Sequence, residues 1–303
     1  MNRDPLRHLF LALAVAAPAG LLVRCSSEPP ATAKVDGGAD GAAGDAAPDV
    51  VVTPCDDQHP CAAPLSCCSN VCVNTAKSPQ NCGACGVACT KTQFCTGKAC
   101  FEAVLKNVCE NPSMAVVLDG IPVDEDAGSS VGSAVSTGCA PAVAVRSIPQ
   151  GAPGTLEDGG RPLLGSGDTY LAAGGPFGQK AVGYVQAARV APIYTLGEVD
   201  SLSFYRTSDN GLIKKALNTE LTAHHDYFAA YLAPDPVTGT LVFALYGVYG
   251  PGTSAGAYFM KNQVMPNRAT FDKAFYIYEW TDGPNQDGLA DATDTITLVA
   301  SGP

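Results

Sequence analysis

Short apolar runs separated by turn-forming residues fill the C-terminal two thirds of the chain and predict a sheet-rich domain. The run at 114–118 is continuous and precedes Asp119-Gly120, as expected for a strand buried on both faces of a sheet. Helical spacing of apolar residues predicts a helix over 179–189. The small residues of 129–138 are compatible with a helix, and 254–264 could form another after Gly250-Pro251-Gly252. Further apolar runs predict strands at 143–148, 168–173, 193–196, 202–206, 212–215, 227–232, 240–248, 275–280 and 295–299.

Turn signals predict how the later strands pair. Asn210-Gly211 precedes the strand at 212–215 and favours a hairpin with the strand before it. The turn-forming cluster 234–239 indicates a second hairpin, and we expect the last two strands to form a third. Because strands first alternate with helices and then dominate, we predict an α/β domain with a mixed sheet over residues 101–303. An all-β sandwich is the alternative.

The first 24 residues have the pattern of an export signal. Arg3 and Arg7 provide a positive segment, and the apolar run at 9–23 that follows is too short for a typical membrane span. We therefore predict a signal peptide over residues 1–24. No later segment of the sequence is long and apolar enough to span a bilayer.

Cys25 directly follows the apolar run, with Leu22 three positions before it and Arg24 where a small residue is usual. This arrangement resembles a bacterial lipoprotein signal, which implies that Cys25 is acylated and anchors the protein to a membrane. The alternative is cleavage after residues 17–19 and free secretion.

Composition defines the segment that follows. Residues 25–54 are dominated by Gly, Ala, Pro and Asp, so they cannot bury enough apolar area to offset the entropy of ordering, and we expect a disordered acidic tether. The whole chain carries a formal net charge of −11, which argues against a nucleic-acid partner because such binding needs a basic face. Its 46% hydrophobic content excludes a wholly disordered chain.

Ten of the 13 cysteines lie in residues 55–100, and this density predicts a disulfide-rich module. So short a segment has too little core to fold without cross-links. Some spacings are compatible with zinc, but an exported chain meets an oxidising compartment, which favours disulfides. We expect five bridges, whose pairing the sequence leaves open, among Cys55, Cys61, Cys67, Cys68, Cys72, Cys82, Cys85, Cys89, Cys95 and Cys100.

Residues 72–89 contain C-V-N followed, after a polar spacer, by N-C-G-A-C-G-V-A-C. This stretch resembles a cysteine-rich repeat of exported proteins from myxobacteria and their relatives. The resemblance implies a surface protein and no enzymatic activity.

Two further cysteines bracket the first predicted strand and helix of the large domain. In a βαβ unit the start of a strand and the end of the next helix lie at the same edge of the sheet. We therefore predict a disulfide between Cys109 and Cys139.

Two glycine-rich turns of the large domain carry a second resemblance. The segments 171–179 and 242–257 are similar to the two strand-to-helix turns of a Rossmann-like domain found in archaeal S-layer and related surface proteins, although Gln179 stands where that family has Asn. The resemblance implies a structural envelope domain without catalysis.

The same turns offer an enzymatic alternative. Ser254 lies in a G-x-S-x-G pattern, but every histidine, including His224, precedes it, whereas this type of hydrolase needs the histidine later in the chain. Gly174–Gly178 could also cradle a phosphate, with Glu198 as a ribose ligand, although the first glycine of the dinucleotide fingerprint is missing. A pocket that joins Gly174–Gly178, Ser254 and His224 would favour a hydrolase-like extracellular enzyme.

His224-His225-Asp226 could bind a metal or act as a base, although a histidine pair on an edge strand without function is the alternative. An acidic loop near the C-terminus provides the best candidate ion site of the sequence. Oxygen ligands at close spacing, with glycine for a sharp turn, suit calcium, and the loop is similar to those of thrombospondin type 3 repeats. A solvated hairpin loop is the alternative. The candidate ligands are Asp282, Asn285, Asp287, Asp291 and Asp294.

These patterns together predict an exported cell-envelope lipoprotein, at the outer membrane or cell surface, with a structural or adhesive role and no catalysis. The expected partners are a membrane, through the lipid anchor, and an envelope protein or polysaccharide. No cofactor is expected, with calcium at the acidic loop as the alternative.

Overall fold

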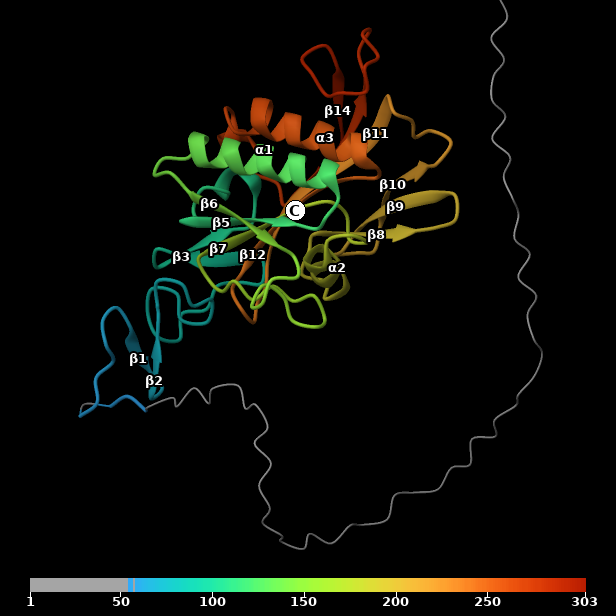
Figure 1. Cartoon of the computed structure of the whole chain (residues 1–303). Coiled ribbons are helices and arrows are strands. Elements are labelled where there is room, and N and C mark those ends of the chain that lie inside the picture. The colour runs from blue at the N-terminus through green and yellow to red at the C-terminus, as the bar shows by residue number, and fades with distance from the viewer. Residues whose placement is uncertain (1–53, 57) are drawn as a thin grey trace, which may run out of the picture. The chain divides into compact units, whose positions relative to one another are not determined.

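A computed structural model describes residues 54–56 and 58–303 (Figure 1). The predicted signal peptide, the proposed acylation site Cys25 and nearly all of the acidic tether lie outside these residues. No helix within the described part of the chain has the length and apolar character needed to cross a membrane.

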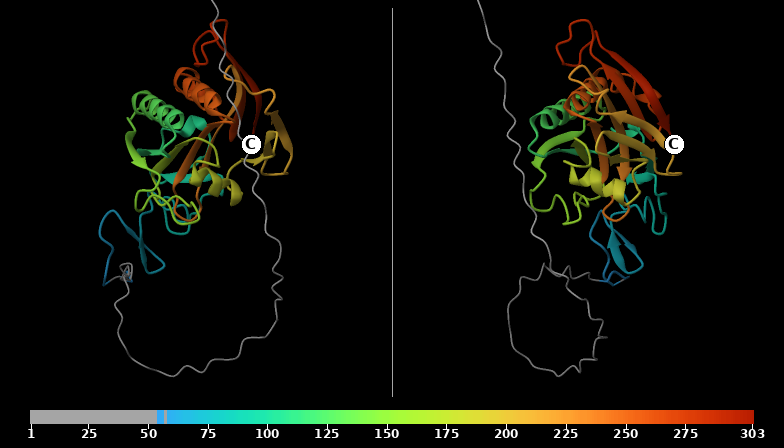
Figure 2. Two further views of the ribbon diagram at one scale, coloured as in Figure 1. Left: turned by 45° about the vertical axis from the view of Figure 1, so that its right-hand side comes forward. Right: turned by 90° about the vertical axis from the view of Figure 1, so that its right-hand side faces the viewer.

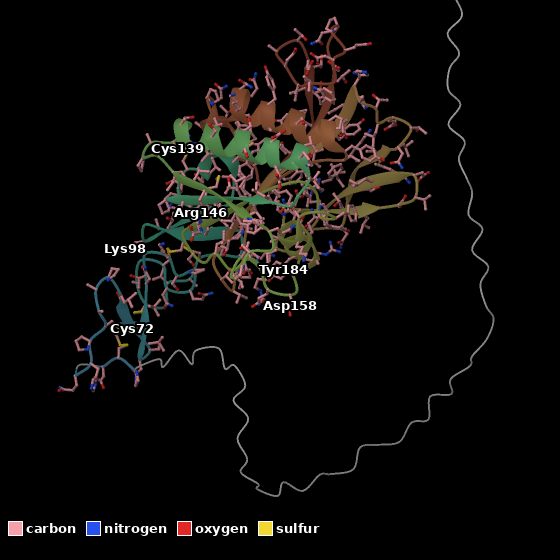
Figure 3. All side chains as sticks on the ribbon, viewed as in Figure 1. Cys72, Lys98, Cys139, Arg146, Asp158 and Tyr184 are labelled. Carbon is pink, nitrogen blue, oxygen red and sulfur yellow. A yellow bond between two sulfur atoms is a disulfide. The ribbon has the colours of Figure 1, made fainter. Side chains whose placement is uncertain are left out.

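The cysteine-rich module contains two small hairpins held together by disulfides. The first hairpin pairs β1 (Ser66–Cys68) with β2 (Val71–Val73), and the second pairs β3 (Gln93–Thr96) with β4 (Ala99–Glu102). All ten cysteines of the module are bridged, which confirms the five predicted disulfides; Figure 3 marks Cys72 among them. The pairs are Cys55–Cys67, Cys61–Cys72, Cys68–Cys85, Cys82–Cys95 and Cys89–Cys100.

The second hairpin also belongs to the core of the large domain. Phe94 of β3 is fully buried in the hydrophobic cluster that includes Leu105 and Val108, and Phe101 of β4 packs against the same cluster. The module and the sheet domain therefore share apolar contacts within the compact unit 51–303.

A seven-stranded mixed sheet forms the centre of the large domain, which confirms the α/β prediction over the sandwich. Its order is β14-β13-β11-β12-β7-β5-β6, and the last four of these strands run parallel while the others pair antiparallel. The strands are β5 (Ser113–Leu118), β6 (Ala144–Pro149), β7 (Asp168–Ala173), β11 (His225–Pro234), β12 (Leu241–Gly247), β13 (Phe275–Thr281) and β14 (Thr295–Gly302).

Helices and a smaller sheet cover the two faces. The helices α1 (Pro122–Gly138) and α3 (Gly250–Phe259) lie side by side on one face (Figure 2). The other face carries α2 (Lys180–Ala187) and a three-stranded antiparallel sheet. Alternate residues of β5 enter the two cores, as expected for a strand buried on both sides. The smaller sheet consists of β8 (Ile193–Gly197), β9 (Ser201–Arg206) and β10 (Leu212–Leu217).

All three predicted hairpins form, as β9–β10, β11–β12 and β13–β14. The helix predicted from residue 129 begins instead at Pro122, and the helix predicted from residue 254 begins at Gly250. Proline fits the first turn of a helix because the N–H that it lacks would have no intrahelical partner there. Acidic residues in the first turn stabilise the helix through their interaction with its dipole. A π-helical turn, Met260–Val264, continues α3, and short 3₁₀ turns lie at Leu105–Asn107 and Arg268–Thr270.

Cys109 and Cys139 form the sixth disulfide, with their Cα atoms 5.5 Å apart, as predicted. The bridge joins the segment before β5 to the end of α1, where Figure 3 marks Cys139.

Candidate functional site

The candidate site is a crevice where the parallel strands β5 and β7 end. β5 and β7 are neighbours in the sheet, and the chain leaves them in opposite directions. From β5 it passes through α1 to β6, on the far side of β5, whereas from β7 it continues to β12, on the far side of β7. Open α/β sheets bind ligands at such switch points, outside the carboxyl ends of the strands. A pocket of about 230 Å³ opens there, and its wall includes Asp124, Thr253, Phe177 and Tyr249.

Two carboxylates meet at this edge of the sheet. Asp119 directly follows β5, and Asp124 lies in the first turn of α1. Gly174, with φ at +108°, leaves room for both, because a Cβ atom there would lie 2.5 Å from Oδ2 of Asp124 and 3.3 Å from Oδ2 of Asp119. Burial raises the pKa of Asp124 to about 6, and the negative charge of Asp119 contributes in the same direction.

Gln179 joins the two strands beneath the crevice. Its fully buried Nε2 donates to the carbonyl oxygens of Val117, at 3.1 Å, and Ala173, at 3.0 Å. These carbonyls lie near the carboxyl ends of β5 and β7, so the side chain fixes the spacing of the strands at the crevice. Gln179 thus performs a structural role beneath the crevice.

Asp226, at the start of β11, holds the N-terminus of α3. Its Oδ2 accepts hydrogen bonds from the backbone N–H groups of Tyr249, at 2.9 Å, and Gly252, at 2.8 Å, and its Oδ1 accepts one from Tyr227. The side chain is fully buried, and this burial raises the pKa of Asp226 to about 6 although the three hydrogen bonds act in the opposite direction.

The raised pKa of Asp226 predicts a loss of stability as the pH rises from about 4 to about 6. In that range the folded state retains a proton that the unfolded state, with an aspartate pKa near 3.8, has already released. The resulting decrease in the free energy of unfolding is at most about 3 kcal/mol. Urea unfolding across this range should show a shallower pH dependence for Asp226→Asn than for the wild type. The exposed Asp158→Asn control should keep the wild-type slope, and an unchanged slope in Asp226→Asn would contradict the assignment.

The residues of the hydrolase alternative lie apart. Ser254 does not line the pocket, and no hydrogen bond in the described structure joins it to a histidine. His224 Nδ1 lies 2.7 Å from Oδ2 of Asp282, and Glu198 accepts a bond from Lys215 in the smaller sheet. The neighbouring His225 places its Nε2 2.7 Å from Oε1 of Glu279, whereas His224 contacts Asp282, so the two histidines bond to different carboxylates.

The acidic loop connects β13 and β14, and its side chains mainly bond to the loop itself. Asp294 accepts hydrogen bonds from Trp280 Nε1 and from the backbone N–H groups of Gly283 and Asp291. Asn285 Nδ2 donates to the carboxylates of Asp287 and Asp291, and Asp282 Oδ2 accepts from the backbone of Gly288. In the described residues, the groups of three or more side chains close enough to share an ion are disulfide-bonded cysteines. Calcium binding at the loop stays a prediction.

Sequence patterns missed Asp119, Asp124 and Thr253 as members of one site. A signal was present for the first of these, because Asp119 directly follows the apolar run of β5 and a carboxylate at the end of a buried strand faces the ligand edge of a parallel sheet. Asp124 and Thr253 lie in the first turns of α1 and α3, both of which begin earlier than their sequence patterns predict.

Comparison with known protein families, with curated proteins and with solved structures finds no match to this chain. The two resemblances, to the myxobacterial cysteine-rich repeat and to the S-layer Rossmann-like domain, therefore remain expectations.

Proposed function

We propose that the chain is an exported cell-envelope protein, anchored through an acylated Cys25, with a structural or adhesive role. The observation that carries this proposal is the pairing of all twelve cysteines between residues 55 and 139 into six disulfides. Such cross-linking indicates an oxidising environment. The thirteenth cysteine, Cys25, stands where the lipoprotein resemblance implies acylation.

The arrangement of the large domain supports a role without catalysis. The hydrolase alternative requires Ser254 and a histidine within hydrogen-bond reach, whereas His224 bonds to Asp282 near the β13–β14 loop. Six disulfides and a sheet buried on both faces favour a rigid protein that persists outside the cell.

An adhesive role would use the outer surface around the crevice. Phe177 and Tyr249 are 76% and 50% exposed at its mouth. Exposed rings beside polar groups are enriched at binding surfaces. We propose an envelope protein or polysaccharide as the partner of this surface. Calcium at the β13–β14 loop would act as a separate structural ion.

Replacing Cys25 with alanine is expected to release the protein from the membrane fraction of its host. Without the thiol no lipid can be attached, and no helix of the described chain could hold the protein in a bilayer instead. Detergent-phase partitioning and immunoblotting of membrane and soluble fractions measure the change. Ser26→Ala is the matched control and should partition like the wild type. A Cys25→Ala protein that stays in the membrane fraction after N-terminal sequencing shows residues 1–24 to be removed would refute the anchor.

A further inference from the structure

We propose that Asp119 and Asp124 hold one hard divalent cation, Mg²⁺ or Ca²⁺, in the crevice at the carboxyl ends of β5 and β7. This inference is independent of the proposed lipid anchor and concerns a different place from the β13–β14 loop. Its support comes from the convergence of the two carboxylates, from buried oxygen atoms without partners, and from the adjoining pocket.

The two carboxylates are aimed at one point. Oδ2 of Asp124 and Oδ2 of Asp119 both lie within 3.3 Å of the position that a Cβ atom would occupy on Gly174. Asp124 is 9% exposed, so water screens this pair of like charges poorly. An ion bound at about 2.0 to 2.6 Å from each oxygen would satisfy both groups and remove their repulsion.

Buried oxygen atoms at this place lack hydrogen-bond partners. Oδ1 of Asp119 accepts a bond from the backbone N–H of Ile121, at 3.0 Å, but its Oδ2 is buried and has no partner. Oε1 of the fully buried Gln179 is also unpartnered, and its Nε2 is bound to the carbonyls of Val117 and Ala173, next to the residues that form the crevice. A buried acceptor atom without a hydrogen-bond partner destabilises the folded state, so we expect a bound group here that these oxygen atoms can coordinate.

The pocket gives such an ion access and room for water. Its wall contains Asp124, Gly178 and the Thr253 hydroxyl, whose oxygen accepts a bond from the backbone N–H of Gly247 at 3.0 Å. Mg²⁺ in proteins is commonly held by one or two carboxylates and keeps several water ligands. Of the two aspartates, Asp124 lines the pocket of about 230 Å³, whereas Oδ2 of Asp119 is buried behind it near Gly174 and Gly178. The β13–β14 loop differs from the crevice, because backbone N–H groups of the loop already donate hydrogen bonds to both oxygens of Asp294.

Calorimetric titration of the full, disulfide-bonded chain with Mg²⁺ and with Ca²⁺, after treatment with a chelator, tests the site. We expect one saturable crevice site that is lost in Asp119→Asn and in Asp124→Asn; calcium bound at the β13–β14 loop would be a second site in the Ca²⁺ titration. The loop variant Asp287→Asn is the matched control and should leave that site unchanged. Binding in the wild type that Asp119→Asn and Asp124→Asn both leave unchanged, or no binding at all, would overturn the proposal.

Terbium luminescence locates the ion even if a crevice variant fails to fold. Trp280 is the single tryptophan, and its Nε1 lies 2.8 Å from Oδ2 of Asp294, so an ion in the loop would be excited through tryptophan. An ion in the crevice would be excited through tyrosines such as Tyr246, which lines the pocket. We expect the excitation spectrum of wild-type protein to contain a tyrosine component that survives in Trp280→Phe and is displaced by Mg²⁺ or Ca²⁺. Emission that disappears entirely in Trp280→Phe would overturn the proposal.

Discussion

Replacing both Cys109 and Cys139 with alanine is expected to lower the free energy of unfolding by about 3 to 4 kcal/mol. The bridge closes a loop of 30 residues, so its removal increases the conformational entropy of the unfolded chain. It also frees the segment before β5 from the end of α1, where Cys139 is buried in the main core. Urea unfolding followed by the fluorescence of Trp280, which is fully buried in the same core, measures the change.

The matched comparison is the pair Cys61→Ala and Cys72→Ala, which opens a loop of 11 residues in the module. Neither cysteine belongs to the main core, so we expect increased amide hydrogen exchange in the module and little change in the unfolding of the large sheet. A Cys109/Cys139 variant that loses less than about 1 kcal/mol would contradict the structural role assigned to the sixth disulfide.

Replacing Gln186 with leucine is expected to cost about 2 to 4 kcal/mol although the two side chains are similar in size. Gln186 lies on α2 and is 5% exposed. Its Nε2 donates to the hydroxyls of Tyr231, at 3.1 Å, and Tyr246, at 2.9 Å, while its Oε1 accepts from the backbone N–H and the hydroxyl of Thr195. Leucine would leave all of these buried groups without this partner.

This amide therefore joins three parts of the fold: α2, the main sheet through the two tyrosines, and the smaller sheet through Thr195 of β8. Thermal and urea unfolding of Gln186→Leu measure the loss. Gln263→Leu, at an exposed position after α3, is the control and should change stability by less than about 0.5 kcal/mol. Equal stability of the two variants would show that the network contributes little.

Elements defined by local patterns were predicted well from the sequence. The apolar run of β5 and the Asn210-Gly211 turn each depend on neighbouring residues, and the structure confirms both. The start of α1 was missed because residues 122–128 have no clear apolar periodicity, and the first turn depends on Pro122 and acidic residues instead.

The disulfide pairing shows why long-range contacts could not be predicted. In the hairpin β1–β2, Cys67 and Cys72 lie directly opposite each other, but Cys67 bonds to Cys55 and Cys72 to Cys61. In β3–β4, Cys95 and Cys100 are likewise opposite and also bond elsewhere. A prediction based on which cysteines face each other in a hairpin would therefore have given Cys67–Cys72 and Cys95–Cys100, and neither disulfide forms. The path of the chain between the hairpins determines the pairing.

The crevice was outside the reach of sequence patterns for a similar reason. Asp119 and Asp124 meet Gly174 because β5 and β7 are neighbours in the sheet, a contact between residues about 50 positions apart that depends on strand order. The G-x-S-x-G pattern around Ser254 arises from the many glycines of this segment. The histidine that a hydrolase would need is not beside it, because His224 contacts Asp282. Local motifs predicted the turns correctly, and the topology decided which side chains meet there.

Mass spectrometry of the mature protein, purified with detergent from the envelope of its host without a reducing agent, tests the central claim most directly. We predict a first residue of Cys25 that carries a lipid, and a mass that corresponds to six intact disulfides. A mature chain that begins elsewhere without a lipid, or that still carries Met1 and reduced thiols, would contradict the account of an exported and lipid-anchored envelope protein.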